Sequence, residues 1–350
     1  MTGLEGVLAR LSEFVAFRTV SGDEGPLAAR IAEICRSEGA EAEVTGRNVV
    51  ARRGAGSPRL LLNSHLDTVP PVAGWSADPW SPRVEGGRLR GLGSNDAKAS
   101  VAAMLEAFLT APLPAEGTLI FAATCDEETG GEGFEKLAPG LPFDAAVIGE
   151  PNDFAVAVAQ KGLVKLRIVA KGKAGHAARP HLAQNAIAAA AKDVLAIEGI
   201  RFDVEDPHLG RPTVAVTMIS GGTKSNVVPD RCELTVDGRT IPGFDNDALI
   251  AVIRAAVSSS SEVEVRSSRL KPVAGESSSR IARAALKAIP GRSVTGFPSV
   301  SDLAHVGGRP AIVFGPGTPD QSHAADESVS LDAVAAAPEI YRRTIREFFQ

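Results

Sequence analysis

Acidic and histidine side chains follow four separate apolar segments of the chain. These segments are RLLLNSHLDTVPP, TLIFAATCDEETGG, FDAAVIGEP and PAIVFGPGTPDQSHAADES. Neighbouring carboxylates repel one another, and burying a single unpaired carboxylate costs several kcal/mol. The adjacent acids Glu127 and Glu128, placed where an apolar run ends, therefore indicate either a solvated surface turn or a strong positive charge beside them.

A divalent metal centre would supply that charge. The candidate ligands at or near the strand ends are His65, Asp67, Asp96, Glu127, Glu128, Glu150 and His323. Two imidazoles with several carboxylates suit zinc or a similar first-row ion, and the set is too rich in oxygen for a structural zinc site. The set also exceeds the three protein ligands of a single catalytic zinc. Two metals that share a bridging carboxylate fit it better.

Each candidate also has a simpler explanation. A histidine at a strand end is more often a satisfied structural residue than a ligand, and Asp67, Asp96 and Glu150 lie in sequences typical of caps or turns. The run DEETGG could be a solvated loop. The metal hypothesis is favoured because four independent strand ends each supply acids or histidines.

Helix and strand patterns alternate along most of the chain. Apolar residues recur at helical spacing in residues 4–17 and 25–40, with Gly39 as the expected C-terminal stop. Continuous apolar runs alternate with helices such as KASVAAMLEAFLTA, which predicts a largely parallel α/β sheet with strands buried on both faces. Ligands bind beyond the carboxyl ends of such strands, where the acids and histidines are expected to meet.

The middle of the chain has a different pattern. The segments GLVKLRIVAKG, PTVAVTMISGG, RCELTVDGRT and SEVEVRSS read as strands, and two helical patterns are interspersed among them. The resulting order β-α-β-β-α-β is the split βαβ, or ferredoxin-like, unit. We therefore expect a smaller domain at residues 161–271, inserted into a domain formed by residues 1–160 and 272–350.

Composition excludes several classes of protein. A net charge of −5, a sequence pI of about 5.8 and the absence of a basic run argue against a nucleic-acid-binding surface. The longest apolar stretches are far shorter than the ~20 residues that span a bilayer, so no membrane partner is expected. The three cysteines form neither a disulfide framework nor a CxxC clip, and no signal peptide is evident. These features predict a cytoplasmic protein.

Eight motifs carry a resemblance to a known family: HLDTVP, GLGSNDAKAS, CDEETGG, IGEP, AGHAARP, SNVVPD, GRTIP and SHAADESV. In this order they resemble the acetylornithine deacetylase and succinyl-diaminopimelate desuccinylase family of di-zinc peptidases and deacylases. The resemblance extends from about Thr19 to the C-terminus. It implies a zinc-peptidase-like catalytic domain, interrupted by a dimerisation domain, and hence a homodimer.

The resemblance also implies roles for the residues of the catalytic domain. One metal would be bound by His65, Asp96 and Glu150, and the other by Asp96, Glu128 and His323. Zinc is the expected metal, and cobalt would accept the same ligands. Asp67 would accept the other ring N–H of His65 and so fix its tautomer. Glu127 would be the general base.

Three residues of the inserted domain would complete the site. His176 would hydrogen-bond the developing oxyanion, across the dimer. Asn226 and Arg239 would recognise the carboxylate of a small-molecule substrate, since a guanidinium suits a partner with two oxygens. No role is assigned to Lys98, Cys125, His181, His208 or His305.

The expected reaction is hydrolysis of the amide bond of an N-acyl amino acid. N-acetylornithine, an intermediate of arginine biosynthesis, is the preferred substrate because the segment before Asp96 is most similar to acetylornithine deacetylases. Succinyl-diaminopimelate desuccinylase, aminoacylase or small-peptide metallopeptidase activity are alternatives within the same family. A non-catalytic binding protein is a further alternative, disfavoured because every expected ligand and the base are present.

Overall fold

The computed structural model describes residues 4–350 and divides them into two compact units. Unit 1 comprises residues up to Val158, together with Gly275–Phe297 and Ser301–Gln350, and unit 2 comprises Ala159–Ala274 and Pro298–Val300. Residues 1–3, part of the predicted first domain, lie outside the described residues. No described helix has the length and apolar character needed to cross a membrane.

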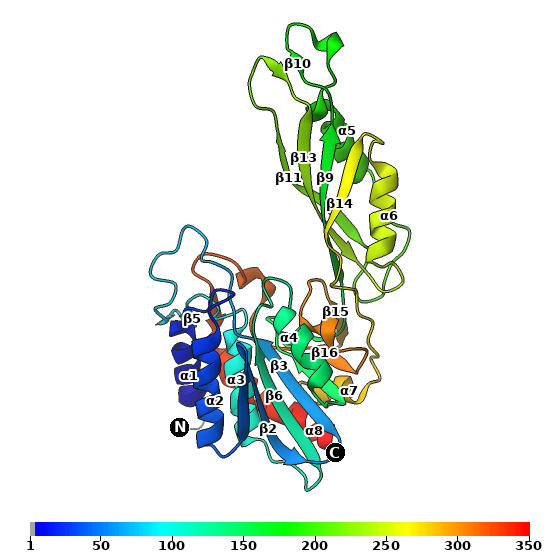
Figure 1. The fold of residues 1–350 in the computed structure, drawn as a ribbon. Helices are drawn as coiled ribbons and strands as arrows, with labels where there is room; N and C mark the ends of the chain where they lie inside the picture. Colours follow the sequence, from blue (N-terminus) through cyan, green and yellow to red (C-terminus); the bar gives the residue numbers. More distant parts are fainter. Residues whose placement is uncertain (1–3) are drawn as a thin grey trace. The chain divides into compact units, whose positions relative to one another are not determined.

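An eight-stranded sheet forms the centre of unit 1, in the order β1-β2-β6-β3-β7-β16-β8-β15 (Figure 1). Its strands are β1 (Glu41–Thr45), β2 (Asn48–Ala55), β3 (Arg59–His65), β6 (Gly117–Thr124), β7 (Ala145–Ile148), β8 (Val156–Gln160), β15 (Val294–Phe297) and β16 (Ala311–Val313). The four apolar segments singled out in the sequence are the adjacent strands β6, β3, β7 and β16, which run parallel. The predicted fold class is confirmed, because the sheet is mixed but mostly parallel at its centre.

The edges of this sheet differ from the prediction. Strand β2 pairs antiparallel with both β1 and β6, and β8 pairs antiparallel with β16. Strands β1 and β2 form a hairpin whose turn contains Gly46 at φ +62°, a conformation that glycine adopts without strain. A hairpin reverses the chain within a few residues, whereas a parallel connection needs a crossover of a dozen or more.

Helices pack around the sheet of unit 1. They are α1 (Leu4–Ala16), α2 (Gly25–Ser37), α3 (Lys98–Thr110), α4 (Glu132–Leu137), α7 (Arg280–Ala288) and α8 (Leu331–Phe349). Helix α2 packs on β1 and β2, α3 packs on β3 and β6, and α7 packs on β7 and β16. Helix α3 is buried along nearly its whole length, so its first turn is held rigidly next to the loop that carries Asp96.

Short elements complete unit 1. A small sheet consists of β4 (Arg83–Glu85), β5 (Arg88–Arg90) and β17 (Ser328–Ser330). Single 3-10 turns occur at Ala138–Gly140, Asp302–His305 and Pro319–Gln321. Strand β17 pairs antiparallel with β5, which fixes the backbone directly after Glu327.

Unit 2 contains a four-stranded antiparallel sheet in the order β11-β13-β9-β14. Its main elements are β9 (Gly162–Lys171), α5 (Ala186–Glu198), β11 (Thr213–Gly221), β13 (Arg231–Thr240), α6 (Asn246–Ala256) and β14 (Ser261–Ser267), with β10 (Gly175–His176), β12 (Val227–Val228) and a 3-10 turn at Pro180–Leu182. Both helices begin at side-chain caps, from Asn185 and Asp245 respectively. They pack against each other and on the sheet, enclosing a separate apolar core.

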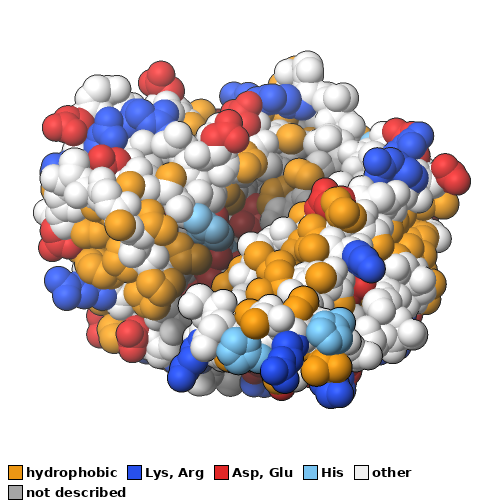
Figure 2. Space-filling model, turned by 90° about the horizontal axis from the view of Figure 1, so that it is seen from above, with side chains coloured by type: hydrophobic (Ala, Val, Ile, Leu, Met, Phe, Trp, Pro, Cys, Tyr) orange, Lys and Arg blue, Asp and Glu red, His pale blue; other side chains and the backbone are white. Residues whose placement is uncertain are grey.

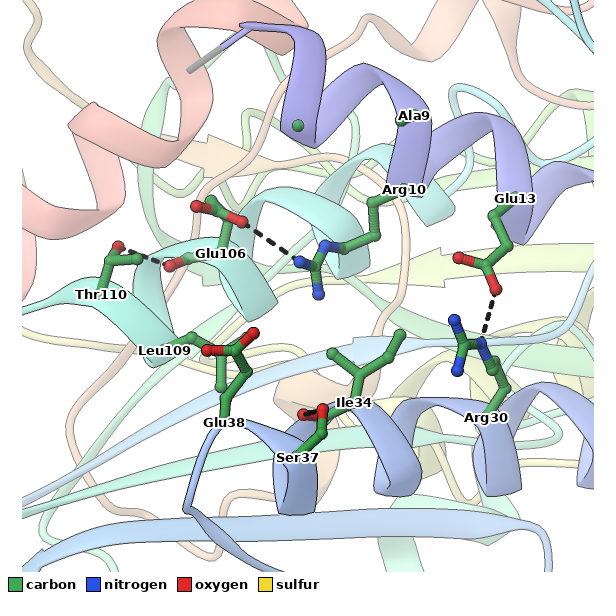
Figure 3. A pocket seen from close by; sticks show the side chains of 11 residues that line it. Ala9, Arg10, Glu13, Arg30, Ile34, Ser37, Glu38, Glu106, Leu109 and Thr110 are labelled. Atoms are coloured by element: carbon green, nitrogen blue, oxygen red, sulfur yellow. Dashed lines mark hydrogen bonds and ion pairs between the residues drawn. The ribbon is translucent and has the colours of Figure 1, made fainter. Parts of the chain in front are cut away.

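A surface pocket of about 430 Å³ lies between α1, α2 and α3 (Figure 3). It contains the ion pairs Arg30–Glu13, at 2.6 Å, and Arg10–Glu106, at 3.5 Å. Glu106 is eight residues beyond the start of α3, about 12 Å along the helix axis. The pocket is therefore remote from the Asp96 loop at the other end of this helix. On the face shown in Figure 2, acidic and basic side chains are interspersed, without an extended basic area among the described residues.

Candidate metal centre

The buried strand β3 delivers His65 to the centre of a cluster of carboxylates. The imidazole is 1% exposed, and its Nε2 lies 3.1 Å from Oδ1 of Asp96 and 3.9 Å from Oε2 of Glu150. Glu150 follows β7, the parallel neighbour of β3, and is also buried. Two adjacent strand ends and the loop before α3 thus bring three potential ligands together.

A second group of ligands shares Asp96. The other oxygen of this carboxylate, Oδ2, lies 3.7 Å from Nε2 of His323, which in turn lies 3.0 Å from both carboxylate oxygens of Glu128. Ligand atoms of His65, Asp96 and Glu128 all lie within 4.8 Å of one another. Asp96 therefore has one oxygen toward each histidine, the arrangement that a bridging ligand requires.

Asp67 holds the turn that carries the two glutamates. Its Oδ1 accepts the backbone N–H of Glu127 and its Oδ2 that of Glu128, each at 3.1 Å, and Oδ2 also accepts the Ser21 hydroxyl at 2.7 Å. The resemblance implied that Asp67 accepts a hydrogen bond from the second ring nitrogen of His65, which is Nδ1 because Nε2 faces Asp96. In the structure this nitrogen is closest to the main-chain oxygen of Asp67, at 3.0 Å, with the carboxylate Oδ1 at 3.5 Å.

The acids of the centre have perturbed pKa values. Burial, reinforced by the charge of Glu150, raises the pKa of Glu127 well above its usual range. Burial also raises the pKa of Glu150 well above its usual range, with the charge of Asp96 adding to the effect. Burial raises the pKa of Glu128 against the hydrogen bond from His323. Burial and mutual repulsion thus disfavour the ionised form of these three carboxylates.

The pKa values of the two histidines are also raised, which favours their positively charged forms. Burial disfavours the charged form of His65, but its hydrogen bonds with Asp67 and Asp96 outweigh this and raise its pKa well above the usual range. The hydrogen bond with Glu128 raises the pKa of His323 to about 9. Protons thus supply positive charge within the cluster. Divalent ions would supply it more effectively, and the donor set of imidazoles and carboxylates fits them.

A different partner explains Asp126, the first acid of the DEE run. Its Oδ2 accepts a hydrogen bond from Arg47 Nη2 at 2.6 Å, and the same guanidinium pairs with buried Glu24. The alternative that the run DEETGG is only a solvated loop therefore does not hold for Asp126, which has a specific cationic partner. Cys125 lies beside this group, but burial raises the pKa of its thiol to about 12, so it stays protonated. The Arg47 guanidinium thus supplies the positive charge for a second group of potential ligands, formed by Glu24, Cys125 and Asp126.

Three of the predicted site residues belong to unit 2. His176 lies on β10, opposite Val227 of β12, and is exposed. Asn226 is also exposed, and its main-chain oxygen accepts the N–H of Ala177. Arg239 on β13 donates through Nε and Nη2 to the carboxylate of Asp237, at 2.7 and 3.3 Å. The guanidinium therefore already has an acidic partner.

Sequence analysis missed several buried polar residues around the centre. Glu327 is 2% exposed and accepts three backbone N–H groups from the loop that ends at Asp96. Asp302, 2% exposed, accepts hydrogen bonds from Asn63 of β3 and Thr124 of β6, and burial raises its pKa to about 6. Glu327 lies within the motif SHAADESV, which could have marked it. No pattern in the sequence singles out Asp302.

Comparison with known proteins gives the family. Residues 61–347 match the model of Peptidase family M20/M25/M40. The chain is 30% identical to an acetylornithine deacetylase from Vibrio atlanticus, covering 88% of this chain and 86% of that protein. It is also 30% identical to a succinyl-diaminopimelate desuccinylase from Paracoccus denitrificans, with both chains covered completely. The crystal structure of an aminopeptidase from Bacillus cereus has the same fold, with a TM-score of 0.83 at 22% identity and 99% coverage of both chains.

The chain belongs to the M20 family of metal-dependent peptidases and deacylases. It is accordingly an enzyme that hydrolyses amide bonds, as the resemblance predicted. Its relatives are named for different substrates at the same level of identity, so the family defines the reaction class, and the substrate is a separate question.

Proposed function

We propose that this enzyme uses two divalent metal ions, zinc in the first instance, to remove the acyl group from an N-acyl amino acid. N-acetylornithine is the proposed substrate. The observation that carries this proposal is the position of Asp96, which has one carboxylate oxygen toward His65 and the other toward His323. A carboxylate between two imidazoles, with further acids on each side, suits a pair of ions better than one.

The proposed ligands follow from these contacts. His65, Asp96 and Glu150 would hold one ion, while Asp96, Glu128 and His323 would hold the other. Bound ions would supply Lewis acidity to activate a water molecule and polarise the substrate carbonyl. Glu127 is left out of both sets, and among residues 4–350 its carboxylate makes no hydrogen bond or ion pair with another side chain. Its carboxylate is therefore available to accept and donate protons.

Glu127 would act as general base and then as general acid. Its carboxylate takes a proton from the attacking water and returns it to the nitrogen of the departing amine, so that Glu127 ends the reaction in its starting protonation state. The turn that presents Glu127 is fixed by the hydrogen bonds from its N–H and that of Glu128 to Asp67. These hydrogen bonds fix the backbone from which the Glu127 side chain projects.

Residues of unit 2 would bind the substrate. We propose that His176 donates a hydrogen bond to the oxyanion, and that Asn226 and Arg239 recognise the substrate carboxylate. The substrate would share the Arg239 guanidinium with Asp237, or displace it, since that pair already engages Nε and Nη2. Arg239 would then contribute to affinity for the substrate and little to the chemical step.

A homodimer formed through unit 2 is part of the proposal. Large apolar side chains are exposed on α5 and on the edge strand β11, which contact each other: Leu195 is 73% exposed, Met218 67% and Ile219 56%. An unpaired strand edge beside exposed apolar side chains is a ready surface for association. A second copy of the same surface would cover both the edge of β11 and the exposed apolar side chains.

The substrate can be tested directly with zinc-loaded enzyme and four compounds. These are N-acetylornithine, N-acetylcitrulline, N-succinylornithine and N-succinyl-diaminopimelate. We expect the highest kcat/KM with N-acetylornithine. If it ranks among the poorest, the proposed substrate is wrong, although amide hydrolysis of another member of the set would leave the reaction class intact.

Succinyl-diaminopimelate desuccinylase is the second candidate. It is favoured by the relative from Paracoccus denitrificans, which aligns with this chain over the full length of both proteins. The same panel distinguishes the two, because a desuccinylase prefers the two succinylated compounds to the two acetylated ones. A non-catalytic binding protein would bind these compounds and hydrolyse none of them.

A further inference from the structure

The loop before α3 is held by a buried carboxylate that lies outside the proposed ligand sets. Glu327 Oε2 accepts the N–H of Gly93 at 2.9 Å, and Oε1 accepts those of Asn95 and Asp96 at 2.8 and 2.9 Å. Successive backbone N–H groups that converge in this way form a concave binding site for an anion. Here the anion is part of the protein itself.

The backbone of Glu327 is fixed on the same loop. Its main-chain oxygen accepts the N–H of Gly91 at 3.0 Å, and the strand β17 begins at the next residue, pairing Ser328 with Arg90. The carboxylate is 2% exposed, so water does not compete for its hydrogen bonds. Three backbone N–H groups of the loop thus have this one carboxylate as their acceptor. The loop conformation therefore depends strongly on this one side chain.

The loop is also tied to the segment that leads to His323. The Asn95 side chain donates through Nδ2 to the main-chain oxygen of Thr318 and to the Ser322 hydroxyl, at 3.0 and 3.2 Å. Its Oδ1 accepts the N–H of Thr318 at 3.0 Å. The Asp96 loop and the segment that leads to His323 are thus joined to each other by the hydrogen bonds of Asn95.

We propose that Glu327 is a positioning residue for the metal centre: it holds the Gly93–Asp96 turn so that the two oxygens of Asp96 point toward His65 and His323. This inference rests on the proposed function, since it concerns the bridging ligand of the same site. Lys98, fully buried in the first turn of α3, joins the helix to this turn by donating its backbone N–H to the main-chain oxygen of Gly93 at 3.0 Å.

Replacing Glu327 by Gln tests the proposal with a minimal change of shape. Glutamine retains one oxygen for Asn95 and Asp96, but its amide NH₂ would face the N–H of Gly93, so that two donors oppose each other. We expect zinc affinity, measured by competition with a chromophoric chelator, to fall about 10- to 100-fold, the usual effect of losing a group that orients a ligand. Glu327→Asp, which retains the charge but shortens the reach, should lose less.

The matched control is Glu106→Gln. Glu106 is another buried carboxylate of unit 1, 6% exposed, that lies toward the far end of α3 and contacts Arg10. This variant should bind zinc like the wild type even if its Tm falls. Wild-type zinc affinity in Glu327→Gln, whatever its Tm, would overturn the proposal.

A measurement on the unaltered protein covers the case in which the Glu327 variants fail to fold. The amides of Gly93, Asn95 and Asp96 should exchange slowly with solvent in the metal-free enzyme, because each donates to a buried carboxylate. Rapid exchange at these three amides would contradict the proposal. Zinc affinity and amide exchange are measured without turnover. An enzyme that binds zinc normally but hydrolyses none of the amides would contradict the proposed function and leave the role of Glu327 intact.

Discussion

Nε2 of His65 lies 3.1 Å from Oδ1 of Asp96, although the two residues are thirty-one positions apart in the chain. His65 is the last residue of the central strand β3, and Asp96 lies two residues before the buried helix α3, so both are anchored to elements of the core. Because the second oxygen of Asp96 faces His323, the position of this one carboxylate affects both proposed ion sites.

Glu127→Ala should retain two zinc ions per chain and lose about 10²- to 10⁴-fold in kcat, because the variant lacks the proton carrier but keeps every proposed ligand. Steady-state kinetics and elemental analysis of the same preparation measure both quantities. Asp126→Asn is the control from the same turn, and it should hydrolyse substrate at close to the normal rate since Asp126 pairs with Arg47. Near-normal turnover by Glu127→Ala would remove the residue from the role of base.

Asp67→Asn should disturb the turn that carries Glu127 and Glu128. The asparagine amide would present a donor to one of two backbone N–H groups that now receive an acceptor, at a cost of about 1–3 kcal/mol in the free energy of unfolding. Activity should fall by about 10- to 100-fold. Chemical denaturation and kinetics check the two effects, and a variant with unchanged values of both would show that the turn does not depend on this carboxylate.

Zinc affinity should rise with pH. The pKa of His323 is raised to about 9 by its hydrogen bond with Glu128, so its imidazole carries a proton at neutral pH in the metal-free enzyme, and the hydrogen bonds of His65 with Asp67 and Asp96 likewise favour its protonated form. Zinc binds the neutral imidazole and must displace these protons, so affinity should increase about tenfold per pH unit for each proton released.

Isothermal titration calorimetry in buffers of different ionisation enthalpy counts the released protons. Uptake of zinc between about pH 6 and about pH 8 should release at least one proton per chain. An affinity that is independent of pH, with no proton release, would mean that the histidines are not ligands.

The homodimer can be tested by disrupting the apolar surface of unit 2. Leu195→Glu places a charge at the centre of the exposed surface on α5 and should convert a dimer into a monomer in sedimentation experiments. Lys192→Glu changes an exposed charge on the same helix and serves as the control. A wild-type protein that is monomeric at all concentrations would contradict this part of the proposal.

Mixing two inactive variants tests whether His176 acts across the dimer. In a heterodimer of Glu127→Ala and His176→Ala, one site has both wild-type residues if His176 comes from the partner. Random exchange of subunits should then restore about a quarter of wild-type activity, since half of the dimers are mixed and each has one intact site. No recovery after demonstrated exchange would place His176 in the site of its own chain, or outside the site.

The sequence predicted the parallel centre of the sheet because strands buried on both faces are continuous apolar runs. Strands β6, β3, β7 and β16 all have this pattern, and their carboxyl ends meet as expected. The hairpin of β1 and β2 was missed, although Gly46 marks its turn, because β1 is short and mostly exposed. Exposed edge strands lack the apolar pattern on which the prediction depended.

The proposed ligands could be named from residue type and position, whereas the buried polar residues around them could not. His65 ends the buried strand β3, and Glu150 lies two residues beyond the buried strand β7, which predicted a common location for them. Glu327 and Asp302 act through backbone amides and through Asn63 and Thr124, respectively, and such contacts join parts of the chain that are more than one hundred residues apart. Local sequence patterns do not encode partners at that separation.

The number of metal ions bound per chain tests the central claim most directly. Metal-free enzyme reconstituted with zinc, freed of excess ion and measured by elemental analysis should contain two zinc ions per chain in the wild type. Asp96→Asn, which weakens the ligand proposed to be shared, should lose occupancy at both positions. Wild-type protein that retains no zinc, or Asp96→Asn that retains both ions as tightly as the wild type, would contradict a paired centre bridged by this residue.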